Sequence, residues 1–170
     1  MEEPPANVAE RPQPMIRHAP SRLLRAALLC AVIDGLFSSV LTLLYGRTVI
    51  SLFERIAVTA FGPAMNDAGA TAALLGLATH FGVALTWSAV FLVLVARASW
   101  LRRVLATRYG VLKVAAVYGP AIWIVMSMIV IPLATRQAPA ITYRWWIQLV
   151  GHGVFVGMPI VGSIGRTPMQ

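Results

Sequence analysis

The chain has 170 residues, of which 58% are hydrophobic and only 12% are charged. An average soluble domain has about a quarter charged residues and just under half apolar residues. This composition excludes an ordinary soluble enzyme and a disordered chain, because too few polar residues remain to cover a globule in water. Lys and Arg outnumber Asp and Glu by 14 to 6, so the placement of the net charge of +8 also needs an explanation.

The first 20 residues differ from the rest of the chain. Residues 1–20 hold five of the 11 prolines and show no apolar periodicity, which predicts a disordered cytoplasmic tail. About 20 polar residues precede the first apolar run, so we expect a retained signal anchor and not a cleaved signal peptide. Residues 21–166 are expected to form one membrane domain, and residues 167–170 a short cytoplasmic end.

Four apolar stretches follow the tail. A membrane-spanning helix needs about 20 mostly apolar residues, and the stretches at about residues 23–45, 72–95, 111–135 and 143–164 meet this requirement. They predict an all-α polytopic membrane protein, a four-transmembrane-helix bundle. The connection at residues 101–110 is short, so the second and third spans should form a hairpin.

The segment between the first two spans is too polar to cross a membrane. Within residues 47–70, apolar residues recur at helical spacing: Val49, Phe53, Ile56 and Ala60. This pattern predicts a short amphipathic helix at the outer surface, which Gly62 and Pro63 end. Such a helix is either a connector whose apolar face sinks into the membrane interface or a lid or docking surface. We favour the connector, because amphipathicity alone specifies no ligand.

The basic residues predict the orientation of the bundle. Ten of them fall in the N-terminal tail, the connection between the second and third spans, or the C-terminal end, whereas four fall on the other side. Under the positive-inside rule both termini are cytoplasmic. Because these residues flank spans and line no groove, we expect no nucleic-acid partner. The four outer residues are Arg47, Arg55, Arg136 and Arg144.

Three ionisable residues lie inside the predicted spans. At a rise of about 1.5 Å per residue, Asp34 is about 13 Å from the cytoplasmic end of the first span, and His80 and His152 are about 12 Å from the outer ends of theirs. In a hydrocarbon core of about 30 Å these depths nearly coincide. Charged groups there are costly and should face the bundle interior. We expect the three to meet near mid-membrane, with Tyr118 of the third span nearby.

Small residues indicate which helix faces are in contact. They recur every four residues on the first two spans, and Gly153 and Gly157 form a GxxxG beside His152, a pattern of close helix packing in lipid. Pro120 and Pro159 should kink the third and fourth spans. The two stripes are Ala26, Cys30, Asp34 and Ser38, and Ala72, Gly76, His80, Ala84 and Ser88.

The polar cluster has four interpretations. In the favoured one, Asp34 bonds His80 or His152 and sets helix register. In the second, burial and pairing oppose each other and make the cluster proton-responsive. In the third, His80 and His152 ligate a haem, although no CxxCH motif is present. A zinc site is the fourth, but no spacing such as HExxH supports it.

No sequence motif predicts an enzyme. The chain has no GxSxG, no Walker loop and no glycine-rich dinucleotide turn. A channel would require an oligomer, because four short helices enclose little space, and the spans lack repeated polar faces. We therefore expect no catalytic residue, no cofactor other than the haem alternative, and no metal.

Part of the chain resembles a known group. The segments "THFGVALTWSAVFLVLVAR", "YGPAIWIVMSMIVIPL" and "QLVGHGVFVGMPIVGSIGR" are similar to the YagU-like group of bacterial inner-membrane proteins, over about residues 72–166. The resemblance rests on His80, on His152 before a terminal basic residue, and on Pro132 closing the third span. It implies a bacterial inner-membrane location and brings no reaction with it.

The sequence therefore predicts a non-enzymatic, small accessory or stress-related protein of the bacterial cytoplasmic membrane. Its expected partners are the lipid bilayer and either a second copy of itself or another membrane protein. A haem-binding redox subunit and a proton-coupled transport component are the alternative classes. In each of them the residues Asp34, His80, His152 and Tyr118 are the candidate site.

Overall fold

The computed structural model describes residues 19–165, which form helices and turns with no β-strand in that range. The predicted tail at residues 1–18 and the C-terminal end at residues 166–170 lie outside the described residues. Ala19 and Pro20, expected in the tail, instead form the first turn of the first helix. A proline is favourable there, because the first turn of a helix leaves its N–H groups without an intrahelical partner.

Four helical segments are long and apolar enough to cross a membrane. The first two are α1 (Ala19–Leu44) and α3 (Ala70–Arg97). The third joins α5 (Gly110–Val125), η2 (Met126–Val130) and α6 (Ile131–Thr135). The fourth joins α7 (Tyr143–His152), η3 (Gly153–Gly157) and α8 (Met158–Gly165). The prediction of an all-α, four-span bundle is confirmed, with span bounds within a few residues of those expected.

The outer surface of the bundle is apolar. Leucines, valines and isoleucines along the four spans are more than one-third exposed, for example Leu36, Val117 and Val150. Large side chains that are fully buried are few, and Phe91 and Ile160 are the largest of them. An apolar surface of this extent would be unstable in water but is suited to lipid. The fold is therefore that of an integral membrane protein with a thin, tightly packed interior.

The helices cross closely at positions where glycine has no side chain to keep the two backbones apart. A Cβ on Gly76 of α3 would collide with the backbone carbonyl of Phe53, and one on Gly119 of α5 would collide with that of His152. A Cβ on Gly157 would likewise collide with the backbone of Ala115. The predicted stripe on α3 is buried at Ala72, Gly76, Ala84 and Ser88. These crossings bring backbones together as small residues allow in lipid.

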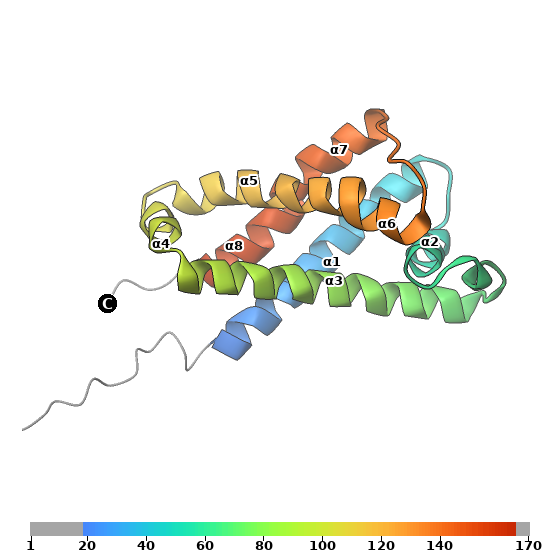
Figure 1. Ribbon diagram of the computed structural model, residues 1–170, viewed down its shortest axis with the longest axis horizontal. Coiled ribbons are helices and arrows are strands. Elements are labelled where there is room, and N and C mark those ends of the chain that lie inside the picture. Colours follow the sequence, from blue (N-terminus) through green and yellow to red (C-terminus); the bar gives the residue numbers. More distant parts are fainter. Residues whose placement is uncertain (1–18, 166–170) are drawn as a thin grey trace, which may run out of the picture.

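Two short helices cap opposite ends of the bundle (Figure 1). Helix α2 (Val49–Phe61) lies beside α6 at one end, which we call the α2 end, and α4 (Ser99–Leu105) lies at the other. The predicted amphipathic helix is present and ends at Gly62, where φ is 91°. Its one fully buried residue is Ala57, and Ala60, expected on the apolar face, is exposed, because Ala57 lies on the side of the helix that packs onto α3.

The connection expected at residues 101–110 is partly helical, because α4 occupies its first half. The Arg102 guanidinium donates hydrogen bonds of 2.8 and 3.0 Å to the carbonyls of Val95 and Ala96. These are carbonyls of the last turn of α3, which have no intrahelical partner. The short helix η1 (Pro63–Asp67) makes the corresponding turn at the α2 end.

The prolines of the third and fourth spans lie in different local geometries. Helix α5 continues through Pro120. The widened π-helical turns η2 and η3 instead come directly before Pro132 and Pro159. A π turn adds one residue and moves the preceding carbonyls away from the proline ring, which lets the span continue. Turns of this kind are common near functional sites.

Candidate functional site

Asp34 lies on α1, about midway along the span, and is half-buried. Its Oδ1 atom is fully shielded and has no hydrogen-bond partner among the described residues. An ionised carboxylate in such a place is costly unless it is paired. The Oδ1 atom of Asp34 is therefore available to a partner that the described residues do not supply.

His80 lies on α3 and packs against the same turn of α1. Its Nε2 atom is 2.9 Å from the carbonyl oxygen of Ala31. A carbonyl only accepts, so Nε2 carries the hydrogen and donates it, which leaves Nδ1 free to accept a proton. A Cβ on Gly35 would lie 3.4 Å from Nε2, so the ring sits over the backbone on both sides of Asp34.

His152 ends α7 and is 8% exposed. Its Nδ1 donates a 2.8 Å hydrogen bond to the carbonyl of Gln148, and its ring lies 4.9 Å from the Trp123 ring, centroid to centroid. His80 packs on the turn of α1 that carries Asp34, and Gly151, next to His152, lies against the Phe37 ring of the following turn of α1. The helices α1, α3 and α7 thus bring the three residues to the same part of the bundle, and no hydrogen bond joins their side chains within residues 19–165.

Their contacts differ from the favoured interpretation. That interpretation has Asp34 hydrogen-bonded to a histidine, yet each histidine donates to a backbone carbonyl and Asp34 Oδ1 is unpaired. The prediction of a hydrogen-bonded Asp–His cluster is therefore wrong. The physical reason is that the carbonyl of Ala31 competes for His80.

Tyr118 does not share hydrogen bonds with the cluster. Its hydroxyl donates a 2.7 Å hydrogen bond to the carbonyl of Trp87, and its ring lies 4.8 Å from that of Phe91. It joins α5 to α3. We define the polar cluster from here on as Asp34, His80 and His152. Within residues 19–165 no group of three or more His, Cys, Asp or Glu is arranged to hold a metal ion.

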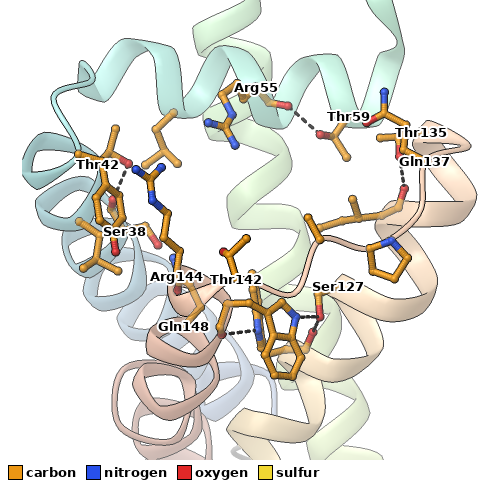
Figure 2. Close-up of a pocket in the computed structure, with 18 of the residues that line it drawn as sticks. Ser38, Thr42, Arg55, Thr59, Ser127, Thr135, Gln137, Thr142, Arg144 and Gln148 are labelled. Carbon is orange, nitrogen blue, oxygen red and sulfur yellow. Dashed lines mark hydrogen bonds between the residues drawn. The ribbon is translucent and has the colours of Figure 1, made fainter.

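A pocket of about 500 Å³ lies at the α2 end, between α1, α2, the connection from α6 to α7, and the start of α7 (Figure 2). None of the described residues that line it is Asp or Glu, and three are arginines. Neither histidine of the polar cluster is among them. The polar lining residues are Ser38, Thr42, Tyr45, Arg47, Ser51, Arg55, Thr59, Ser127, Thr135, Gln137, Thr142, Arg144 and Gln148.

One arginine of the pocket, Arg144, is held in place by aromatic rings. The Arg144 guanidinium carbon lies 3.7 Å from the centre of the Tyr45 ring, and its Nε donates a 3.2 Å hydrogen bond to the Tyr143 hydroxyl. Burial, Arg47 and Arg144 together lower the pKa of Arg55 from its ordinary value. The charges of Arg47, Arg55 and Arg144 are therefore close enough to repel one another.

A tryptophan pair forms one wall of the pocket. Trp145 Nε1 donates a 3.0 Å hydrogen bond to the Ser127 hydroxyl, which donates at 2.6 Å to the Trp123 carbonyl. Trp123 Nε1 in turn donates at 3.1 Å to the Trp145 carbonyl. Because Trp123 also packs on His152, this wall connects the pocket to the polar cluster.

Gln148 makes a second connection between the two regions. Its side chain lines the pocket, and its Oε1 is buried without a hydrogen-bond partner among the described residues. Its backbone carbonyl accepts the hydrogen bond from His152. Ser38, which also lines the pocket, lies one helical turn beyond Asp34 on α1. Polar side chains therefore continue from the pocket to the cluster.

Sequence reasoning found the cluster but not the pocket. It used Arg47, Arg55 and Arg144 only as a count of charges on one side of the membrane. Two of them lie in or just before α2, and one lies at the start of the fourth span. These positions could have predicted that the arginines lie close together, because the ends of spans on the same side of the membrane are neighbours in a bundle. The fold that brings α2 over those ends is needed to see the pocket.

Comparison of the chain with family models, with curated proteins and with solved structures gives no match. The class of the protein therefore rests on the fold and on the geometry described above. These define a multi-pass, four-span α-helical membrane protein with a polar cluster in its interior and a basic pocket at one end.

Proposed function

We propose that the protein is a non-enzymatic accessory protein of the bacterial cytoplasmic membrane whose polar cluster makes it responsive to protons. The observation that carries this proposal is the buried, unpaired Oδ1 of Asp34 on the turn of α1 against which His80 packs. The distribution of basic residues supports a cytoplasmic position for both termini. The resemblance to the YagU-like group agrees with this location, and a second copy or another membrane protein would be its partner within the bilayer.

The geometry supports proton uptake at defined atoms. In their neutral forms, His80 keeps Nδ1 and His152 keeps Nε2 without a hydrogen, because the other nitrogen of each ring donates to a carbonyl. A proton added to either histidine or to Asp34 changes the charge of a group buried between helices. In a medium of low dielectric constant, the electrostatic energy of such a charge change is large. The change therefore favours a different helix packing.

Other ionisable side chains in the bundle could also change charge with pH. Two further ionisable side chains lie in the core of the bundle, the buried Cys30 of α1 and the partly buried Tyr118 of α5. Both are neutral groups at physiological pH under ordinary conditions. Neither group is therefore expected to change its charge near neutral pH.

Tryptophan fluorescence tests the proposal. The Trp123 ring lies 4.9 Å from that of His152, and a protonated imidazole at this distance quenches an indole. The full chain in lipid nanodiscs should show pH-dependent fluorescence that His152→Gln abolishes, and whose midpoint Asp34→Asn moves. The control is Lys113→Gln, which removes a charge at the α4 end and should leave the midpoint unchanged. A pH response that is absent, or that is identical in the wild type and Asp34→Asn, would refute the proposal.

A further inference from the structure

The basic pocket at the α2 end carries concentrated positive charge with no internal compensation. Arg47, Arg55 and Arg144 line it, and none of its described lining residues is acidic. Figure 2 shows the side chains of Arg55 and Arg144 directed into the same space from opposite walls, one from α2 and one from α7. Like charges facing one another across a cavity destabilise the fold unless an anion occupies the space between them.

The geometry of Arg144 leaves it able to bind such an anion. The Tyr45 ring covers one face of the guanidinium, with its centre 3.7 Å from the guanidinium carbon. The Tyr143 hydroxyl accepts a hydrogen bond from Nε alone. The terminal N–H groups along the other edge remain available for a second partner. A guanidinium stacked on an aromatic ring is also held in a fixed orientation, which reduces the entropy lost on binding.

We infer that this pocket binds a phosphate group, carried either by a phospholipid headgroup or by a soluble phosphate compound. Phosphate matches the site better than a carboxylate does, because it offers more acceptor oxygens and more negative charge to three guanidinium groups. The hydroxyl of Thr142 and the amide of Gln137 supply neutral donors around them. The volume of about 500 Å³ exceeds that of a bare ion and accommodates the group to which the phosphate is attached.

The position of the pocket makes both sources accessible. It is lined by Leu41, Ile131 and Trp145, which lie near the ends of three spans, so it falls at the level where headgroups meet water. A lipid headgroup would enter from the side and a soluble compound from the water phase. The binding chemistry is the same for both, and the experiment distinguishes them.

The test measures binding to the full chain in two arms. Inorganic phosphate is titrated into the protein in phosphatidylcholine nanodiscs by calorimetry, and the retention of phosphatidylglycerol against phosphatidylcholine is measured from mixed micelles by native mass spectrometry. Arg55→Gln and Arg144→Gln should each weaken binding by about tenfold or more, as the loss of a charge-assisted hydrogen bond does. Arg144→Lys should lose part of this affinity, because it keeps the charge but not the planar fork.

The matched control is Arg103→Gln, which removes an exposed arginine at the α4 end and should change affinity by less than about twofold. Binding in the phosphate arm supports a soluble ligand, and selective retention of phosphatidylglycerol supports a headgroup. If neither probe binds, or if Arg103→Gln weakens binding as much as the pocket variants do, the inference is overturned. Should Arg144→Gln fail to fold, the affinity of Arg55→Gln decides the result.

Discussion

Gly76 of α3 provides a stringent test of the helix packing. A Cβ at this position would overlap the backbone carbonyl of Phe53 on α2, whereas a Cβ on Gly82 of the same helix would meet nothing within 4 Å. We therefore compare Gly76→Ala with Gly82→Ala. Both substitutions add the same methyl group to the same helix, so their difference isolates the contact between α2 and α3.

The magnitude follows from two opposing effects. Replacing glycine by alanine in a helix stabilises it by about 1 kcal/mol, and this gain is common to both variants. Overpacking against a backbone atom costs about 1–3 kcal/mol, and only Gly76→Ala incurs this cost. The free energy of unfolding should therefore be lower for Gly76→Ala than for Gly82→Ala by about 1–3 kcal/mol.

The assay is equilibrium unfolding in mixed micelles of a mild detergent and dodecyl sulfate, followed by circular dichroism. Because α2 also lines the basic pocket, Gly76→Ala should weaken phosphate binding in addition, and Gly82→Ala should leave it unchanged. Equal stability of the two variants would refute the close crossing of α2 over α3. Equal stability would also remove the structural basis for α2 as a wall of the pocket.

Three further predictions concern other parts of the fold. Ser127→Ala should lower stability by about 1–2 kcal/mol, measured by the same unfolding assay, because Trp145 Nε1 loses its acceptor; unchanged stability would contradict the tryptophan wall. Thr48→Ala should cost about 1 kcal/mol and shift α2 toward faster backbone hydrogen exchange, because Thr48 accepts from the Ser51 N–H at the start of the helix; unaltered exchange in α2 would argue against this cap. In a Cys30→Ala background, single cysteines at Asn66 and Thr107 should react with an impermeant thiol reagent from opposite sides of the membrane, Asn66 from outside; labelling of both from one side would exclude the proposed orientation.

Much of the fold was predictable from local patterns in the sequence. Each span is a run of apolar residues whose length matches the membrane, and lipid forces such a run to be helical because its backbone polar groups have no other partner. The stripe through Ala72, Gly76 and Ala84 was recognisable for the same reason, since only small residues allow backbones to approach in lipid. The depth of Asp34, His80 and His152 followed from counting residues.

The partners of those side chains were not predictable in this way. His80 donates to the carbonyl of Ala31, which every residue possesses and no sequence pattern marks. Asp34 is left unpaired for that reason, and the sequence alone favoured the opposite arrangement. The rotation of α2 that buries Ala57 and exposes Ala60 likewise depends on where α3 lies.

The sequence by itself determined that the chain is an all-α protein with four spans and ionisable groups at one depth, because the thickness and polarity of the bilayer act on each segment separately. Only the tertiary structure decided which atoms those groups contact. It also decided that Arg47, Arg55 and Arg144, which are far apart in the sequence, share one pocket. The physical reason is that a hydrogen bond forms only at about 3 Å and a charge interaction weakens with distance, so both depend on how the helices pack and not on the order of residues.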